Sequence, residues 1–260
     1  MLAHKRKQMI KELVDRYRII RVSDLSERFN ISDVTIRRDL KELEAMGVLR
    51  RTHGGAIKIA NTGTELPLAE ADDEQIKERY SIAKAAYRTI KDGDSIMLDS
   101  SSTAAMLATL IKNGDTHGLT LVTSSFRVVS ELTGCPNADM IHIGGQVQHQ
   151  TQSAAGPIAE NTLRNLRVDK SFIGVNGVSL ESGFTTPNIL QCQVKRSMLS
   201  CAKQSYVLAD ASKFNQTHLS IICPLSTPDY VITDFTIEPE MVSAFQVHGI
   251  NLMVAPEEDA

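Results

Sequence analysis

The 260-residue sequence contains no apolar stretch approaching the roughly 18 residues that a membrane-spanning helix needs. Its first residues, Met1-Leu2-Ala3-His4-Lys5-Arg6-Lys7, lead into a polar segment, whereas a secretion signal would continue with an apolar core. These two absences predict a cytoplasmic protein without a membrane partner.

The sequence also lacks the cysteine patterns of disulfide frameworks and zinc sites. Its four cysteines, Cys135, Cys192, Cys201 and Cys223, form no CxxC pair and no Cys/His zinc spacing. The seven histidines are scattered, and no pair has the spacing that places two metal ligands on one helix face. We therefore expect reduced thiols, no metal and no cofactor.

The charges are unevenly distributed along the chain. Residues 1–58 hold 14 Lys and Arg against 8 Asp and Glu, a formal charge of +6, whereas residues 59–260 carry −9. A small basic segment attached to a larger acidic body is typical of a polyanion-binding module joined to a second function. Charge alone leaves open an unevenly solvated surface. The length allows one or two domains.

Residues 1–57 have the pattern of a small helical domain. Ser23 is predicted to cap a second helix, and Ser32 to cap a third that runs from Asp33 to Met46 and stops at Gly47. Two helices joined by a short turn, the second capped and basic, are typical of a helix-turn-helix. The first helix, residues 4–17, has an apolar face that consists of Ile10, Leu13, Val14 and Tyr17.

The third helix is predicted to bury Ile36, Leu40 and Leu43 and to present a basic face to solvent. At about 100° per residue, four side chains cluster opposite the apolar stripe, with Thr35 on the flank. These four are Val34, Arg37, Arg38 and Lys41. Arginine can fork onto guanine O6 and N7, and Ser32, Thr35 and the first helix amides can bind backbone phosphates.

After Gly47, the pattern changes to a strand, a Gly54-Gly55 turn and a second strand. Arg51 and His53 lie near that turn, where a wing would contact a flanking minor groove or phosphate, and Ser23 is a further DNA-contact candidate. The order of elements predicts a small, mainly α-helical winged helix-turn-helix that binds double-stranded DNA. The alternative for Arg37 and Arg38 is a merely solvated helix face.

The run VSDLSERFNISDVTIRRDL, residues 22–40, is similar to the signature of the DeoR family of bacterial regulators. RTHGGA, residues 51–56, resembles that family's wing. The resemblance implies a winged helix-turn-helix that binds operator DNA, usually as a repressor. Operator DNA with paired half-sites is bound by two DNA-binding domains. We therefore also expect a homo-oligomer, either a dimer or a tetramer.

Beyond a linker predicted at residues 58–74, short apolar runs alternate with helical stretches through residues 75–260. This alternation indicates an α/β domain with a mainly parallel sheet covered on both faces. The predicted strands are Ser95–Leu98, Leu119–Thr123, Met140–Ile143, Ser171–Val175, Tyr206–Ala209, Tyr230–Thr233 and Asn251–Val254. The predicted helices are residues 75–91, 103–112, 126–133, 156–166, 188–203 and 238–247.

Polar residues follow several predicted strands, and ligands of such sheets bind beyond the carboxyl ends of the strands. The run of residues 99–103 opens a helix, where amides and hydroxyls suit a phosphate group. Each loop alone is compatible with an ordinary polar turn, but four together predict one anion-binding pocket. The other three are Thr123-Ser124-Ser125, Gly144-Gly145 and Asp210-Ala211-Ser212-Lys213.

The body also resembles the sugar-phosphate sensor domain of the DeoR family, notably in LDSSST at residues 98–103 and LADASKF at residues 208–214. The resemblance implies a fold related to ribose-5-phosphate isomerase that binds a phosphorylated sugar or polyol. Ser101 replaces the usual Gly, Ser124 the usual Asn and Gln191 the usual Glu. The expected effector contacts are Asp99, Ser101, Ser102, Thr103, Thr123, Ser124, Gly145, Lys195 and Lys213.

Two rival functions remain open at this point. The first is a sugar-phosphate isomerase with a DNA-binding head, but residues 174–178, Gly-Val-Asn-Gly-Val, lack the carboxylate base that isomerisation needs. Glu181 is nearby and is expected in an exposed turn. The second is an architectural protein, which has no need of a polar pocket. For Lys195, a surface position on its helix is the alternative to a ligand contact. For Asp99, the alternative is a cap on the following helix or bonds to the loop amides.

Overall fold

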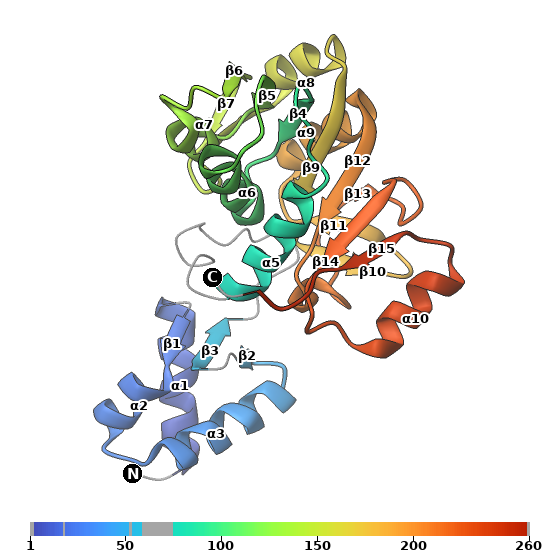
Figure 1. Cartoon of the computed structure of the whole chain (residues 1–260). Helices are drawn as coiled ribbons and strands as arrows, with labels where there is room; N and C mark the ends of the chain where they lie inside the picture. Colours follow the sequence, from blue (N-terminus) through green and yellow to red (C-terminus); the bar gives the residue numbers. More distant parts are fainter. Residues whose placement is uncertain (1–2, 18, 52–53, 59–74, 259–260) are drawn as a thin grey trace. The chain divides into compact units, whose positions relative to one another are not determined.

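The computed structural model describes residues 3–17, 19–51, 54–58 and 75–258, which form two compact units (Figure 1). The division between the units falls after residue 61. The predicted linker, residues 58–74, lies outside the described residues except for Lys58, which is the last residue of a strand. Each unit is described separately below.

The first unit combines three helices with a small antiparallel sheet whose strand order is β1-β3-β2. Its elements are α1 (Ala3–Tyr17), β1 (Ile19–Arg21), α2 (Val22–Phe29), α3 (Asp33–Ala45), β2 (Leu49–Arg51) and β3 (Gly55–Lys58). The predicted wing hairpin is therefore confirmed and gains a third strand. Its core consists of Ile10, Val14, Ile20, Val22, Leu25, Ile36, Leu40, Leu43, Leu49 and Ala56.

The turn between α2 and α3 is built by local backbone chemistry. Asn30 closes α2 in the left-handed conformation with φ of 54°, and its amide donates to Glu27 O. Ser32 is the N-cap residue of α3, as predicted, although its hydroxyl lies 3.0 Å from that of Thr35 and accepts no backbone amide within the described contacts. Gly47 follows the end of α3 with φ of 67°.

The prediction that Ser23 caps α2 is wrong. The helix begins one residue earlier, at Val22, and its N-cap residue is Arg21. The reason is that Val22 is buried and its amide donates to Gly54 O at 2.8 Å, so that the chain turns from β1 directly into the helix. The Ser23 hydroxyl is exposed and donates to Asp24 Oδ1 at 3.1 Å.

The second unit is centred on a seven-stranded sheet whose order is β15-β14-β12-β9-β4-β5-β6. Every neighbouring pair in this sheet is parallel, which confirms the predicted α/β class. Its strands are β4 (Ser95–Leu98), β5 (Leu119–Thr123), β6 (Ala138–His142), β9 (Val168–Gly174), β12 (Ala202–Leu208), β14 (Tyr230–Thr233) and β15 (Leu252–Val254).

Helices pack against both faces of this sheet, because successive strand residues point to opposite sides. Ile96 and Leu98 belong to one core with α5 (Ile76–Tyr87), α6 (Ser102–Asn113) and α7 (Phe126–Leu132). Met97 and Ile173 belong to a second core with α8 (Pro157–Arg164), α9 (Ile189–Cys201) and α10 (Pro239–Val247). The carboxyl ends of the strands thus meet the first turns of α6, α7 and η1 (Ala211–Lys213) at one edge.

Two smaller antiparallel sheets were not predicted from the sequence. One is the hairpin β7 (Gln146–Gln148) and β8 (Ser153–Ala155), whose Ser153 forms a bridge with Ser125 beyond β5. The other has the order β10-β11-β13. Its strands are β10 (Gly177–Ser179), β11 (Gly183–Thr186) and β13 (Ser220–Cys223). Both follow the carboxyl ends of parallel strands and therefore border the predicted pocket.

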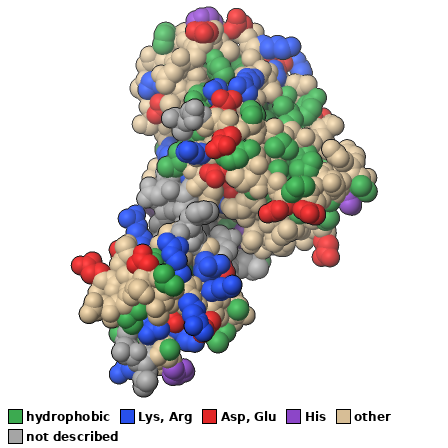
Figure 2. All heavy atoms as spheres, turned by 60° about the horizontal axis from the view of Figure 1, so that its bottom comes forward, with side chains coloured by type: hydrophobic (Ala, Val, Ile, Leu, Met, Phe, Trp, Pro, Cys, Tyr) green, Lys and Arg blue, Asp and Glu red, His purple; other side chains and the backbone are tan. Residues whose placement is uncertain are grey.

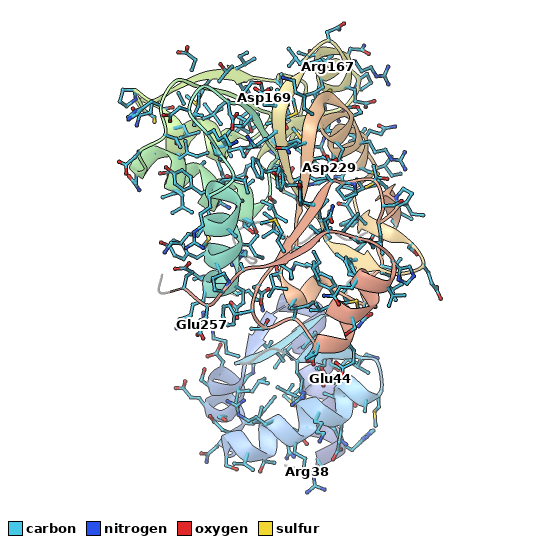
Figure 3. The ribbon with its side chains drawn as sticks, turned by 45° about the vertical axis from the view of Figure 1, so that its right-hand side comes forward. Arg38, Glu44, Arg167, Asp169, Asp229 and Glu257 are labelled. Carbon is cyan, nitrogen blue, oxygen red and sulfur yellow. The ribbon has the colours of Figure 1, made fainter. Side chains whose placement is uncertain are left out.

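A serine–aspartate clamp, in which the two residues exchange hydrogen bonds, joins neighbouring parallel strands at two places: at the amino ends of β4 and β9, and where β14 begins beside β12. The Ser95 amide and hydroxyl donate to Asp169 Oδ2 at 2.9 and 2.6 Å, and the Asp169 amide returns a bond to the serine oxygen at 3.0 Å. Ser205 and Asp229 repeat the pattern at 2.7, 2.8 and 3.1 Å. Both aspartates are labelled in Figure 3. The clamps fix the register of β4 against β9, and of β12 against the start of β14.

Burial keeps most of the thiols inert. All four cysteines are free, and burial raises the pKa of the Cys223 thiol to about 11. Burial also raises the pKa values of Cys192 and Cys201. Among the described residues, no three His, Cys, Asp or Glu side chains gather into a metal-binding group. None of the helices described is both long and apolar enough to cross a bilayer.

Candidate nucleic-acid interface and effector site

The exposed face of α3 carries the four side chains that the sequence predicted. Val34 is 77% exposed, and Arg37, Arg38 and Lys41 are exposed as well, whereas Ile36 on the opposite side is fully buried. Figure 2 shows Lys and Arg side chains gathered over the first unit, and Figure 3 shows Arg38 projecting away from the ribbon. An uncovered basic face on a short helix has the shape and charge to enter a major groove.

Arg38 is held only by weak surface contacts. Its Nε lies 3.4 Å from Glu42 Oε1, one turn along the helix, and its side chain remains 81% exposed. Glu42 in turn accepts from Lys7 Nζ of α1 at 2.6 Å, and this bond, followed by the Lys7 charge, lowers the pKa of the Glu42 carboxyl. Because exposed pairs contribute little, Arg38 can exchange Glu42 for a DNA phosphate or base edge.

The wing is joined to the carboxyl end of α3 through Arg51. Its backbone amide and Nε donate to the two carboxylate oxygens of Glu44 at 2.8 and 2.7 Å. Gly55 is required at the start of β3, since a Cβ atom there would lie 1.9 Å from Ile20 O. His53, predicted as a second wing contact, lies outside the described residues. The wing strand and the recognition helix therefore form one connected surface.

In the second unit, the loop after β4 is organised by Asp99. This buried carboxylate accepts from the Ser101 amide at 3.0 Å, the Ser101 hydroxyl at 2.6 Å and the Gly174 amide at 2.9 Å. The Lys195 ammonium also donates to Asp99 Oδ2. With these four bonds, Asp99 fixes the conformation of the loop and joins it to the end of β9 and to α9.

Two α9 side chains reach this loop and its neighbour. Lys195 is buried and donates to Gly174 O at 2.9 Å as well as to Asp99, so the surface alternative for Lys195 is wrong. Gln191, one turn earlier, is buried and donates to the hydroxyls of Thr151 and Ser153 at 3.1 and 2.8 Å. The helix thus presents one cation to the β4 loop and one neutral amide to the β7–β8 hairpin.

Ser101 and Ser102 face different surroundings. Ser101 is the N-cap residue of α6, and its oxygen accepts from the Ala104 amide at 3.2 Å. Ser102 instead accepts from Arg79 of α5 at 2.9 Å, beside a groove of about 280 Å³. The residues lining this groove are Ile76, Arg79, Ser102, Ala105, Met106, Thr109, Arg127 and Glu131.

Arg79 was missed by the sequence reasoning. It is only 4% exposed, and its Nε also donates to Gln75 O at 3.3 Å. A buried guanidinium beside the first turn of α6 adds positive charge where the helix dipole already favours an anion. The only sequence signal was a charged residue on the otherwise apolar face of a helix.

The remaining predicted effector residues lie at the same edge of the sheet, but they differ in burial and in their contacts. Thr103, Thr123 and Ser124 are buried, and Thr123 Oγ1 accepts from the Ser125 amide at 3.0 Å. Gly145 has no room for a side chain, because a Cβ atom would lie 2.6 Å from Ala155 O. Lys213 Nζ is 3.7 Å from Asp210 Oδ2, beyond β12 and two strands from β4. Among the described contacts, none joins Lys213 to the Asp99 loop.

The position expected to hold a base in an isomerase carries none. Gly174 ends β9, and Gly177 begins β10, with Val175 and Asn176 between them. Glu181 is exposed in the turn between β10 and β11, as the sequence indicated. This segment offers backbone groups and an asparagine, but no carboxylate, to a ligand at the strand ends.

The two units together define a class of protein. A basic recognition helix with a wing is typical of a DNA-binding domain. An α/β unit with polar loops at the strand ends is typical of a domain that binds a small molecule. Residues 6–62 match the family model of the DeoR-like helix-turn-helix domain, and residues 74–235 match that of the DeoR C terminal sensor domain. The chain belongs to the DeoR family of DNA-binding transcriptional regulators.

Full-length relatives agree with this assignment. The chain is 34% identical to the uncharacterized HTH-type transcriptional regulator YulB of Bacillus subtilis (strain 168), over 98% of both chains. It is 31% identical to the HTH-type transcriptional regulator GlpR of Haloferax volcanii, over 97% of this chain and 98% of the relative. It is 30% identical to the lactose phosphotransferase system repressor of Lactococcus lactis subsp. lactis, over 92% and 95%.

Among solved structures, ribose 5-phosphate isomerase A from Methanocaldococcus jannaschii is 20% identical over 52% of this chain and 53% of that chain, with a TM-score of 0.38. The parallel sheet and its two helical layers are established by the structure of this chain itself.

Proposed function

We propose that this regulator represses a sugar or polyol catabolic operon and is controlled by a phosphorylated sugar bound in its second unit. The observation that carries the proposal is the loop of residues 99–103 at the start of α6. Its amides and hydroxyls are framed by Asp99 and flanked by two buried cations, Lys195 and Arg79. The names of GlpR and of the lactose phosphotransferase system repressor support the link to small carbon compounds.

The loop has the groups that a phosphate needs. A helix N-terminus supplies amides and a favourable dipole, and hydroxyls and cations add charge-assisted bonds. Lys195 has three N–H donors, of which Asp99 and Gly174 O take two, so that one is left for a ligand. The hydroxyls and the Gln191 amide around the β7–β8 hairpin suit the neutral hydroxyls of a sugar.

The protein is proposed to bind its ligand without turning it over. Aldose–ketose isomerisation requires a base near the sugar carbons, usually a carboxylate. Residues 174–178 contain none, and Asp99 is fully engaged by Ser101, Gly174 and Lys195. Measuring consumption of aldose and ketose phosphates tests this point, and genuine turnover by the purified chain would establish the isomerase alternative instead.

Control of DNA binding is proposed to act through two states of a homo-oligomer. Two recognition helices bind paired half-sites of operator DNA, and the second unit supplies the contacts between copies. A ligand can shift this equilibrium only if its affinity for the two states differs. The proposal therefore requires that the sugar phosphate bind more tightly to the state whose recognition helices no longer match the operator.

Thermal melting with a panel of sugar phosphates tests the sensor. A true effector at a hundred times its dissociation constant should stabilise the second unit by about 2.7 kcal/mol. The matching free sugars and inorganic phosphate serve as controls. Arg79→Met should reduce the shift. Arg88→Met changes the C-cap residue of the same helix, which is exposed and paired with Glu258, and should retain the shift. No shift with any member of the panel at millimolar concentration contradicts the proposal.

A further inference from the structure

The recognition helix is anchored to α1 by a buried, fork-shaped ion pair. Arg6 Nε donates to Asp39 Oδ2, and Arg6 Nη2 donates to Asp39 Oδ1 at 3.1 Å. The two side chains are only 7% and 6% exposed. The hydrogen bond to Asp39 is the main cause that raises the pKa of Arg6, so the guanidinium stays charged at any physiological pH.

Stability alone does not explain a pair of this kind. The buried core of the same unit is apolar, and it includes Ile10 on the helix of Arg6 and Ile36 and Leu40 on the helix of Asp39. Removing two charges from water costs several kcal/mol each, and apolar residues of similar volume often do as well or better at such positions. A bidentate ion pair instead restrains the relative orientation of the two helices, because two parallel bonds fix both the distance and the angle between their partners.

The orientation of α3 matters because Asp39 lies in sequence between Arg38 and Lys41, two of the residues predicted to face DNA. At about 100° per residue, Arg37 and Lys41 are both about 200° from Asp39, which places them nearly opposite it on the helix. Holding Asp39 against α1 therefore turns these two side chains outward. Glu42, one turn further along, is held by Lys7 of α1 at 2.6 Å and lies 3.4 Å from Arg38.

We propose that the Arg6–Asp39 pair is a positioning device for DNA recognition: it sets the rotation of α3 about its own axis and thereby determines operator specificity, without contacting DNA. Lys7–Glu42 is the outer half of the same anchor. A rotation of α3 moves base-reading side chains away from their hydrogen-bonding partners, but it leaves the basic charge of the unit in place. Specific binding should then suffer while non-specific binding persists.

The test replaces the pair with apolar residues of similar size, Arg6→Met together with Asp39→Leu. The probes are a duplex selected from a random pool by the wild-type protein and a scrambled duplex of equal length. We expect a folded variant that binds scrambled DNA as wild type does, with the same salt dependence. Its preference for the selected duplex should fall by about tenfold or more, as expected for a lost base contact.

The matched control is Lys11→Met with Glu12→Leu, which removes the same kinds of charge from exposed positions of α1. Its preference for the selected duplex should remain that of the wild type. An unchanged preference in the folded Arg6→Met/Asp39→Leu variant overturns the proposal. If that variant does not fold, Arg6→Lys decides, because it keeps the charge and loses the fork. A clearly reduced preference supports the positioning role, and a wild-type preference overturns it.

Discussion

Ser101 and Gly174 lie so close together that a Cβ atom added to Gly174 would be 2.3 Å from the Cβ atom of Ser101. Gly174 ends β9, and Ser101 follows β4, the neighbouring strand. The Gly174 amide and carbonyl are also bonded to Asp99 and Lys195. The serine that replaces the usual glycine of the loop is thus accommodated by the absence of a side chain on the next strand.

Gly174→Ala should accordingly destabilise the second unit. An extra methyl group in a packed site typically costs about 1–3 kcal/mol. The atoms that it would meet are those of the Ser101 side chain, which is held by its bonds to Asp99 and to the Ala104 amide. Scanning calorimetry measures the loss. Gly144→Ala is the matched control, since a Cβ atom there meets nothing within 4 Å. Equal melting temperatures for the two variants contradict the prediction.

Arg37→Ala and Arg38→Ala should each weaken binding to the selected duplex. A lost bidentate base contact costs about 1–3 kcal/mol and relaxes the sequence preference at one position. Titration of labelled DNA at several salt concentrations measures both effects. Arg164→Ala, an exposed arginine of α8 in the second unit, is the control and should bind normally. Wild-type affinity in both α3 variants shows that the recognition face is assigned incorrectly.

Lys195→Met should unfold the second unit more easily, because it leaves the Asp99 carboxylate buried without its cation. Breaking one side of a buried pair typically costs about 3–5 kcal/mol. Lys203→Met is an informative comparison, since Lys203 also pairs with a carboxylate, Asp169, but is 76% exposed. Chemical denaturation followed by circular dichroism is suitable, because the chain has no tryptophan. Equal losses in the two variants would show that burial of the Lys195–Asp99 pair is unimportant.

Acid should weaken the fold partly through Asp169. The bond from Lys203, followed by those from Ser95, holds the pKa of the Asp169 carboxyl well below its usual range. Because the unfolded pKa is about 3.9, this contribution is fully present above that pH and is lost as the pH falls toward the lower folded-state value. Denaturation curves should therefore show a smaller loss of stability below pH ~4 in Asp169→Asn than in the wild type.

The control for the acid series is Asp115→Asn, which changes an exposed carboxylate of the same unit. That variant should follow the wild-type pH dependence. An Asp169→Asn protein whose stability declines with acid as steeply as that of the wild type contradicts the assignment.

The elements with strong apolar periodicity could be predicted closely from the sequence. β4, β5 and β14 begin and end at the predicted residues, because runs such as Ser95–Leu98 are short, apolar and bounded by turns. The basic face of α3 was also predictable, because its apolar stripe fixes which side is buried. In contrast, β8 has the sequence Ser-Ala-Ala and β10 Gly-Val-Ser, which carry no such pattern.

The candidate effector site was predictable in its location but not in its contacts. A polar run after a buried strand indicates the ligand edge of a parallel sheet, and the structure brings Asp99, Ser101 and Lys195 together there. No local pattern could show that Ser102 turns toward Arg79, since these two residues belong to different helices and are 23 positions apart in sequence. Nor could it show that Asp99 is engaged by Gly174, 75 residues later.

The serine–aspartate clamps hold the strands at one edge of the sheet, whereas the polar loops lie at the opposite edge. At the amino edge, Ser95–Asp169 and Ser205–Asp229 fix the alignment of the strands without help from the loops at the far end. Loops at the carboxyl edge can then exchange residues, as Ser101 and Gln191 illustrate, while the scaffold keeps its alignment. An architecture of this kind separates the residues that align the strands from those in the loops at the opposite edge of the sheet.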